Sequence, residues 1–494
     1  MTGTAGFNSL KWQSGRFRSV RTIRFRVVPD RLPFKTFAER RAGARSGPLA
    51  VRAAVVGVLL LGLSAVDGGA QVPLAEHRTA AVDSATAARD AWRRGAAAFN
   101  ANDMRAAHTE LKRAALAWPT QPEYLWGRVI SAARIADTAD VIAGLMGYVN
   151  IGLGRMVHSD TTLRRYHAIP AVRAAEAKME ANIAPRVKSH RVASMADSTF
   201  WPEGVDFDAR TSNFYVASIR HRTVAELRPD GTTRELWARG RPDLGAMMGV
   251  RVDMQRGVLW ATTSGVPQTS GYLPADSGIA ALLRIRIADG VIERRWDIPP
   301  APGGHALGDL AVSAQGDVFM TDSNHPVLYR LRSGGDTLEH MTSPLFRSLQ
   351  GMAPTPDGRT LYVADYSHGL LRVDLRDGQV VRLDDAPGST SIGCDGIVLD
   401  RTGAIVAVQN GVSPARIMRF VIDSNRTHIT RTEVLDRNAA NADEPTIGTL
   451  AHGVFVYVAN SQWDKYDSEG KRRPTVPLTA PLLLGVPLPP GGRQ

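Results

Sequence analysis

From Phe200 onward the sequence repeats one pattern six times, and this repetition constrains the fold more than any other feature. Each copy contains a short strand rich in Val, Ile and Tyr, an Asp/Gly turn, and a second strand that ends in a polar residue. Six phased copies, spaced about 41–61 residues apart, predict a mainly β fold. The expected architecture is a six-bladed β-propeller with one four-stranded blade per copy. The copies are EGVDFD from Glu203, MGVRVDMQRGVLWATT from Met248, GDLAVSAQGDVFMTDS from Gly308, QGMAPTPDGRTLYVADYS from Gln350, DGIVLDRTGAIVAVQN from Asp395 and EPTIGTLAHGVFVYVANS from Glu444.

The end of the chain bears on how such a ring closes. Residues 474–490 are rich in proline and resemble a tail, but the segment from Leu478 to Leu488 is apolar enough for a strand. Because an unpaired edge strand invites wrong pairing, a propeller has to close its ring. We therefore predict that Ala480–Pro487 forms a strand of the last blade, and that His190–Ala196 supplies the overlapping closing strand.

Residues 82–188 are rich in alanine, and their apolar residues recur at helical spacing. The spacing of small and large residues and a proline after Gly95 is typical of a tetratricopeptide repeat. The residues with this spacing are Ala107, Leu111, Ala114 and Pro119. Further helix is expected at Leu163–Ile183. This region could offer a groove for a partner or serve as a helical prop for the next domain, and the sequence favours the prop.

The predicted organisation has a basic extension with a signal peptide over 1–70, a tetratricopeptide-like helical domain over 71–190, and the propeller over 191–494. The apolar run Ala53–Val66 follows a basic stretch and precedes small residues, which is the layout of an export signal. The run is shorter than the about 20 residues that a transmembrane helix needs. We expect a secreted or periplasmic protein that does not span the membrane once the signal is cleaved. The long basic stretch indicates that translation begins near Val51, with a true basic arm over 1–50 as the alternative.

The net charge of +12 would suit a nucleic-acid ligand, but its position in the chain argues against one. Residues 1–70 hold twelve Lys or Arg and three acids, so nine of the twelve net charges lie in the segment expected to be removed. The mature chain is close to neutral, and no nucleic-acid partner is expected. The single cysteine, Cys394, excludes a disulfide framework and a four-thiolate metal site. It has no basic neighbour in the sequence, and we interpret it as a small core residue.

In a propeller, the first-strand starts and the second-strand ends converge on one mouth around the axis, where a ligand is expected. The first strands start at Glu203, Met248, Asp309, Gln350, Asp395 and Glu444, and the second strands end near Ser218, Thr263, Asp322, Asp365, Asn410 and Asn460. Oxygen donors dominate both sets, and hard cations such as Ca²⁺ prefer oxygen ligands. This predicts a divalent metal on the axis, held by Glu203 and Asp395 with help from Asp309 or Asp365. The alternative is that these acids accept hydrogen bonds from backbone amides of neighbouring blades.

Three second strands end with the same spacing to a histidine, and this pattern suggests a second candidate for chemistry. The three are Ser218-x-x-His221, Asp322-x-x-His325 and Asp365-x-x-His368. Histidine titrates near neutral pH, so one of them, His368 first, could activate water for attack on an ester. The alternative is that these residues only shape the hairpin. The residues expected to line the mouth that a substrate enters are Asp322, His325, Asp365, His221, Asn410 and Asn460. The loop Ser264–Ser277 on the same side is either a lid or a tolerated insertion.

The repeats resemble the gluconolactonase, senescence-marker-protein and luciferin-regenerating-enzyme-like propellers of the calcium-dependent phosphotriesterase superfamily. The resemblance covers about residues 200–488, and its best segments are WPEGVDFD, LQGMAPTPDGRTLYVADYSHGLLRVDL and CDGIVLDRTGAIVAV. It implies a lactone hydrolase with one divalent metal on the propeller axis. The family's metal-binding Glu matches Glu203, and its metal-binding Asp, which is also its proposed general base, matches Asp395. Its third ligand, an Asn, matches Gln350, and its substrate-contacting Asn matches Gly308, so that contact is absent although Asp309 is retained.

The leading interpretation is therefore a secreted propeller that resembles lactonase-type, metal-dependent hydrolases and acts on a small ester or lactone. The metal at Glu203, Gln350 and Asp395 would polarise the carbonyl, and Asp395 or His368 would handle the proton. The altered positions do not support specificity for a sugar lactone. The competing interpretation is a non-catalytic extracytoplasmic propeller that binds a ligand at its mouth or a protein through its helical domain, because fold alone does not carry function.

Overall fold

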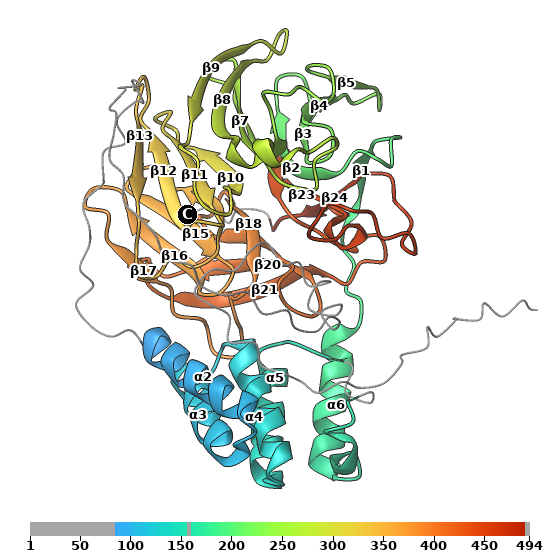
Figure 1. The fold of residues 1–494 in the computed structure, drawn as a ribbon, viewed down its shortest axis with the longest axis vertical. Coiled ribbons are helices and arrows are strands. Elements are labelled where there is room, and N and C mark those ends of the chain that lie inside the picture. Colours follow the sequence, from blue (N-terminus) through green and yellow to red (C-terminus); the bar gives the residue numbers. More distant parts are fainter. Residues whose placement is uncertain (1–83, 156–159, 490–494) are drawn as a thin grey trace, which may run out of the picture.

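The computed structural model describes residues 84–155 and 160–489, and it confirms the predicted fold class. A helical region is followed by six four-stranded sheets arranged as the blades of a propeller (Figure 1). The expected signal peptide and the rest of residues 1–83 lie outside the described residues. Among the residues that are described, no helix is long and apolar enough to cross a membrane.

The helical region consists of two antiparallel helix pairs and one further helix. Its elements are α2 (Ser84–Asn100), α3 (Met104–Ala117), α4 (Pro122–Arg134), α5 (Thr138–Asn150), the 3₁₀ turn η1 (Arg164–Tyr166) and α6 (Pro170–Ile183). A Cβ on Gly95 would lie 2.7 Å from Cγ of Leu111, so the small residue of the predicted spacing is what lets α2 and α3 approach. The expected helix over 163–183 is divided, because Pro170 lacks a backbone N–H and starts α6 as a new helix.

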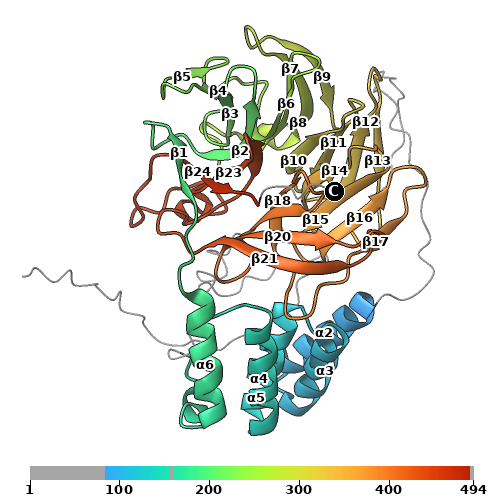
Figure 2. The same cartoon turned by 180° about the vertical axis from the view of Figure 1, so that it is seen from behind.

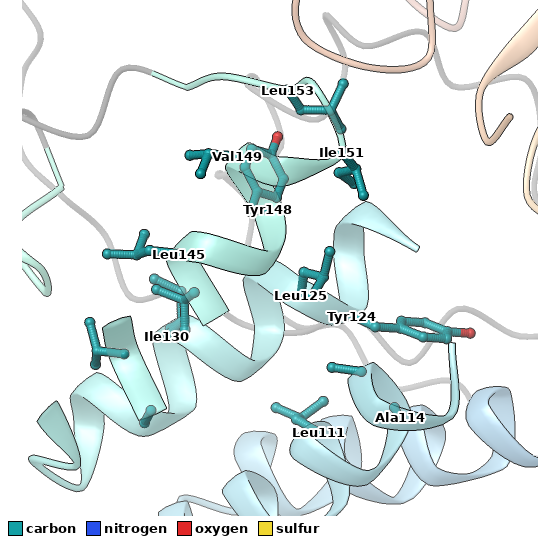
Figure 3. Close-up of a cluster of buried hydrophobic side chains, with 14 of the residues drawn as sticks. Leu111, Ala114, Tyr124, Leu125, Ile130, Leu145, Tyr148, Val149, Ile151 and Leu153 are labelled. Atoms are coloured by element: carbon teal, nitrogen blue, oxygen red, sulfur yellow. The ribbon is translucent and has the colours of Figure 1, made fainter. Parts of the chain in front are cut away.

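The apolar faces of these helices form one buried cluster, part of which is drawn in Figure 3. Leu111 of α3, Leu125 of α4 and Leu145 of α5 are at most 3% exposed in its centre. Two propeller residues, Ile392 and Val412, belong to the same cluster. The helical region therefore shares a core with the propeller, which favours the prop among the two interpretations of its sequence.

Five of the six blades take their four strands from consecutive segments of the chain. Blade one contains β2 (Pro202–Asp208), β3 (Asn213–Ser218), β4 (Thr223–Leu227) and β5 (Thr233–Glu235). Blade two contains β6 (Ala246–Asp253), β7 (Val258–Ser264), β8 (Ala280–Arg286) and β9 (Ile292–Asp297). Blade three contains β10 (Leu307–Val312), β11 (Val318–Asp322), β12 (Val327–Leu331) and β13 (Leu338–Met341). Blade four contains β14 (Leu349–Pro354), β15 (Thr360–Asp365), β16 (Gly369–Asp374) and β17 (Val380–Arg382), and blade five contains β18 (Cys394–Leu399), β19 (Ile405–Gln409), β20 (Arg416–Ile422) and β21 (Ile429–Arg437).

Blade six closes the ring with strands from both ends of the propeller sequence. Its strands lie in the order β1 (His190–Ser194), β24 (Leu482–Pro487), β23 (Val454–Val458) and β22 (Gly448–Ala451). The antiparallel register pairs His190 with Gly485 and Ser194 with Leu482. Both predictions about closure, a strand within Ala480–Pro487 and a closing strand within His190–Ala196, are confirmed. This pairing leaves neither end of the ring as a free edge.

The helices lie on one side of the propeller, next to β20 and β21 (Figures 1 and 2). Their contacts are with connections at the end of the propeller where the second strand of each blade finishes. Thr120 donates to Asp385 over 2.7 Å, Arg416 donates to the carbonyl of Gly152 over 2.8 Å, and Arg437 donates to the carbonyl of Ala184 over 2.8 Å. The helical region thus covers the mouth face over blades four and five.

Candidate functional site

The innermost strands show which residues form one ring around the axis. Each of the five blades from one to five has a register shift in its first strand, with the same two residues between the paired positions. The equivalent residues at the first of these positions are Glu203, Met248, Gly308, Gln350 and Asp395, and the backbone bonds of blade six put Thr446 at the same place. The sequence prediction that Asp309 and Glu444 belong to this ring is off by one and two residues, because the extra residue of the bulge is not visible in a repeat alignment.

The second position of the bulge is glycine in four blades, and these glycines bring neighbouring blades together at the axis. A Cβ on Gly204 would lie 2.2 Å from the carbonyl oxygen of Met248, and a Cβ on Gly351 would lie 2.6 Å from the backbone nitrogen of Ile397. Blade three has Asp309 at this position, where it is 1% exposed. A carboxylate is therefore placed at a position where four of the other blades tolerate only a hydrogen atom.

Glu203 of β2 is 8% exposed and is held by two donors from the segment that follows β23. Ser461 Oγ donates to its Oε2 over 2.5 Å, and Trp463 Nε1 donates to the same oxygen over 2.9 Å. Burial, and then the nearby charge of Asp395, raise the pKa of Glu203 to about 8. The other carboxylate oxygen, Oε1, has no hydrogen-bond donor among the described residues.

Asp395 of β18 has a similar environment in blade five, and only blade six lies between it and Glu203 on the ring. Asn410 Nδ2 donates to Asp395 Oδ2 over 2.6 Å and also to the carbonyl of Pro445 over 2.7 Å. Burial raises the pKa of Asp395 to about 7, against the lowering effect of the Asn410 bond and with a contribution from the charge of Asp309. Glu203 and Asp395 therefore titrate close to neutral pH as an interacting pair.

Asp309, predicted to help hold a metal, is already paired with a cation from the neighbouring blade. Arg251 Nη2 of β6 lies 3.2 Å from Asp309 Oδ1, and the backbone N–H of Leu310 donates to the same oxygen over 2.7 Å. Arg251 also donates to the carbonyl of Val250 over 2.8 Å, which fixes the guanidinium beside the axis. Burial still raises the pKa of Asp309 above its ordinary value. The arrangement gives Asp309 a structural ion pair.

The donor set of the ring fits a hard divalent cation. Glu203 and Asp395 each offer a carboxylate oxygen without a protein donor, and Gln350 offers an amide oxygen, since its Nε2 faces Ser348 Oγ at 3.4 Å. All three donors are oxygens, and two acids whose pKa values are raised by desolvation are stabilised by a cation. The described part of the chain contains no group of three or more His, Cys, Asp or Glu side chains that could hold an ion. A cation on this ring would therefore depend on the Gln350 amide and on water in addition to the two carboxylates.

Asp322 and Asp365, predicted at the mouth, cap the turns that follow their strands. Oδ1 of Asp365 accepts from the backbone N–H groups of Ser367 and His368 over 3.0 and 2.9 Å, and Oδ2 accepts from those of Arg347 and Ser348 over 2.7 and 2.9 Å. Asp322 Oδ1 likewise accepts from the backbone N–H of His325 over 3.2 Å. Ser218 Oγ accepts from the backbone N–H of His221 over 3.2 Å. The recurring spacing to histidine therefore reflects a capped turn, the alternative that the sequence left open.

The three histidines of this spacing do not converge. His221 lies 3.3 Å from Thr199 Oγ1 in blade one, and His325 packs on His305, whose Nδ1 is 2.5 Å from Asp322 Oδ2. His368, predicted as a catalytic residue, is 3% exposed beneath the helical region. Its Nδ1 donates to the carbonyl of Leu345 over 2.5 Å, its Nε2 accepts from Arg89 Nη1 at 3.2 Å, and its ring stacks on Trp118. With both ring nitrogens occupied, His368 serves the interface between the domains.

Asn460 also has a structural role at the end of the ring. Its Nδ2 donates to the carbonyl of Ala480 over 2.8 Å and its Oδ1 accepts from the N–H of Leu482 over 2.9 Å, so it anchors the start of β24. Asn410 is the member of the predicted mouth set that contacts the ring directly. Cys394 is fully buried and its pKa is raised by burial, in agreement with a core residue.

The sequence interpretation missed the loop between β23 and β24, residues 459–481, which covers the mouth above Glu203. Trp463 lies in its 3₁₀ turn η3 (Trp463–Lys465), and Trp201 stacks on Tyr466 with ring centroids 4.5 Å apart. Together with Met248 these aromatic residues form one buried cluster. The signal that could have found it is the long gap between β23 and β24, which contains Trp463 and Tyr466 and is longer than the equivalent loop of blade two, residues 265–279.

The predicted lid, Ser264–Ser277, does lie on the mouth face, with the 3₁₀ turn η2 (Pro274–Gly278) at its end. Gln268 Nε2 donates to the carbonyl of Asp467 over 3.2 Å, so this loop contacts the loop of blade six. Arg222 holds it from beneath through an ion pair with Asp276 at 2.8 Å. These contacts tie the segment to the propeller at several points.

Comparison with known proteins supports the family resemblance. Residues 201–441 match the profile of the family described as SMP-30/Gluconolactonase/LRE-like region, so the propeller of this chain is of the gluconolactonase-like type. Similar solved structures include a gluconolactonase from Xanthomonas campestris, with 18% identity over 61% of this chain and 89% of that one and a TM-score of 0.40. They also include the calcium-binding protein regucalcin from Agrobacterium tumefaciens, with 16% identity over 60% and 93% of the two chains and a TM-score of 0.40. A virginiamycin B lyase from Staphylococcus aureus shows 15% identity over 55% and 81% of the chains and a TM-score of 0.40. No curated protein matches the sequence.

Proposed function

We propose that the propeller is a metal-dependent hydrolase of small esters or lactones, with its reacting centre at the axial ring. The observation that carries the proposal is the pair Glu203 and Asp395, which occupy equivalent positions in two blades and whose pKa values are raised to about 8 and about 7. The gluconolactonase-like family supports a small-molecule substrate of this kind. Glu203, Gln350 and Asp395 would hold the metal, which supplies Lewis-acid polarisation of a carbonyl oxygen when bound.

The residues of this chain account for the movement of the proton. Oδ1 of Asp395, which has no protein donor among the described residues, would face the metal, and Oδ2 keeps a second lone pair beside the Asn410 bond to accept a proton from water. Water then adds to the ester carbonyl carbon, the bond from that carbon to the alkoxy oxygen breaks, and Asp395 returns the proton to the leaving oxygen. The products are an acid and an alcohol, or a single hydroxy acid from a lactone. Arg251 keeps Asp309 out of this exchange by pairing with it.

The test is hydrolysis of a panel of lactones and aryl esters, measured with added calcium, magnesium or manganese and in the presence of a chelator. Glu203→Gln and Asp395→Asn should abolish both metal binding and hydrolysis in folded protein. Asp377→Asn is the matched control, because Asp377 is an exposed acid at the turn between β16 and β17. Hydrolysis that persists in the chelator, or in Asp395→Asn, would contradict the proposal.

A second candidate function is supported by one observation. Glu203 is 8% exposed beneath Trp463, and such limited access to the axial pair favours a propeller that binds a partner through its outer surface and catalyses nothing. Folded protein that binds no metal and hydrolyses nothing on the panel would leave this non-catalytic function.

We also propose that the protein acts outside the cytoplasm, in the periplasm or after secretion. The support is the order of charges and apolar residues over 1–70, with the short apolar run Ala53–Val66 before small residues. Cell fractionation and N-terminal sequencing of the mature protein test this. A mature chain that begins at Met1 and stays in the cytoplasm would contradict it.

A further inference from the structure

A chain of contacts runs from the helical region to Asp395. Gln121, which precedes α4, donates from Nε2 to the carbonyl of Ser367 at 3.4 Å, and Arg89 and Trp118 hold the adjacent His368. Both contacted residues belong to the turn after β15. The preceding residue of that turn is Tyr366, whose hydroxyl donates to Asn410 Oδ1 over 2.8 Å. Asn410 in turn donates to Asp395.

Three contacts set which way the Asn410 amide faces. With its Oδ1 accepting from Tyr366, the amide turns its Nδ2 toward two acceptors, Asp395 Oδ2 at 2.6 Å and the carbonyl of Pro445 at 2.7 Å. A reversed amide would place Oδ1 against both acceptors. These acceptors fix which end of the amide carries Nδ2, and the tyrosine hydroxyl holds Oδ1 in place, so loss of the hydroxyl should loosen the amide without reversing it.

The position of Tyr366 is itself fixed by its surroundings. Its N–H donates to the carbonyl of Ser348 over 2.8 Å, and its carbonyl accepts from the N–H of Gly393 over 3.0 Å. Its ring lies against Gly411, where a Cβ would come 2.6 Å from Cζ of the tyrosine. The segment from Tyr366 to His368 is thus clamped between blade five and the helical region.

We propose that the helical region is a positioning element for the axial site, and that Tyr366 and Asn410 are the positioning residues through which it acts on Asp395. Docking of α2, α3 and α4 fixes the turn after β15, the turn fixes the tyrosine, and the tyrosine fixes the amide that orients the carboxylate. The inference rests on the proposed function only in so far as it gives Asp395 a reaction to perform. The contacts themselves can be tested without any substrate.

The experiment uses the full chain and two readouts. The first is the exchange rate of the Asn410 side-chain amide protons, observed by NMR with ¹⁵N-asparagine labelling, which requires no activity. The second is the separation of kcat from KM on the best ester or lactone of the panel. The variants are Tyr366→Phe, Gln121→Glu and their double mutant. Gln121→Glu removes the donor to Ser367 and keeps an acceptor for the N–H of Glu123, which Gln121 Oε1 binds at 2.9 Å. Arg93→Ala, an exposed residue of α2, is the control.

Tyr366→Phe should raise the Asn410 exchange rate and lower kcat by about 10-fold with KM unchanged, the scale seen when a supporting contact to a reacting ligand is lost. Gln121→Glu should have a smaller effect in the same direction and none in the Tyr366→Phe background. Unchanged Asn410 exchange in both single variants, or effects that add in the double mutant, would overturn the proposal. If the protein hydrolyses nothing, the exchange readout still decides the matter, so failure of this inference and failure of the proposed function are distinguishable.

Discussion

The two sides of the propeller mouth each hold one carboxylate of the axial pair, but they are covered by different parts of the chain. Over blades one, two and six, which we call the loop-covered side, the loop after β23 places Trp463 and Ser461 on Glu203. Over blades four and five, the helix-covered side, a separate helical region presses on the turn that carries Tyr366. Asp395 is held from there through Asn410.

The difference lies in what each cover is made of. The loop-covered side is an apolar cluster of aromatic rings and Met248 that belongs to the propeller itself. The helix-covered side combines the stack of Trp118 on His368 with hydrogen bonds to residues far apart in sequence, such as Arg89 and His368, which are 279 residues apart. We infer that the hold on Glu203 is lost only when the propeller unfolds, whereas the hold on Asp395 can be loosened by undocking the helices.

The largest effect is expected from Trp463→Ala on the loop-covered side. Trp463 is 8% exposed and packs against Trp201 at 5.0 Å, so truncation should lower the free energy of unfolding by about 3–5 kcal/mol, as for other buried tryptophans. Trp463→Phe keeps an aromatic ring but leaves Glu203 without one donor, and should cost about 1–3 kcal/mol. Urea unfolding measures both. Equal losses in the two variants would contradict an aromatic cover.

Glu203→Gln tests the cost of ionising the acid beneath that cover. Because the pKa of Glu203 is raised to about 8 in the folded protein, the unfolded state loses its proton first as pH rises from about 4.3. The stability of the metal-free protein should therefore fall between about pH 4.3 and pH 8, with an upper bound of about 5 kcal/mol from this group.

In Glu203→Gln most of that fall should disappear, so the variant should be the more stable protein at pH 9 in a chelator. Calcium added to the parent protein should recover stability at the same pH, since a cation between two ionised acids relieves their repulsion. Urea unfolding at pH 5, 7 and 9 provides the measurement. A parent and variant with parallel pH profiles would show that Glu203 ionises freely.

On the helix-covered side, Trp118→Ala should weaken the docking of the helical region on the propeller. Trp118 is 3% exposed, stacks on His368 at 5.7 Å and lies under the guanidinium of Arg382 at 4.8 Å. We expect a loss of about 2–3 kcal/mol, less than for a tryptophan in the centre of a domain, because the helices can open without the propeller. Limited proteolysis should cut the helical region first, while Leu116→Ala, at an exposed position, should leave the pattern unchanged.

The sequence predicted the architecture because the blades are local structures. Each contains a strand, a turn and a strand within one repeat, and the requirement for a closed ring then fixed the partners His190–Ala196 and Ala480–Pro487. It also placed Glu203 and Asp395 on the axial ring, since both stand at the start of a repeat. The one-residue error at Asp309 arose because the bulge adds a residue to each first strand without changing the pattern of apolar residues.

The parts that could not be predicted depend on contacts between distant segments. The role of Trp463 follows from a loop that is longer in blade six than in any other blade, so a comparison of the repeats does not predict it. His368 looked like a mouth residue because its turn does lie on the mouth face. The turn after β15 is exposed to solvent or packed against Trp118 depending on whether the helical region docks on it, and the repeats contain no information about that docking.

The smallest effect on stability should come from substitution of His368. This residue should make the stability of the helix-covered side depend on pH. Burial lowers the pKa of His368, and the charges of Arg89 and Arg347 act in the same direction, whereas Asp365 and the bond to Leu345 oppose them. As pH falls below about 6.5, the unfolded state takes up a proton before the folded state does, so stability is lost with acid. A protonated Nε2 could no longer accept from Arg89, and two cations would face each other at the edge of α2.

His368→Gln should remove this pH dependence of stability between pH 6.5 and 5, an effect of about 1.4 kcal/mol for each tenfold change in the protonation equilibrium. If proteolysis of the helical region rises equally with acid in both proteins, the pH sensitivity belongs to another group and the helix-covered side is not held through this histidine.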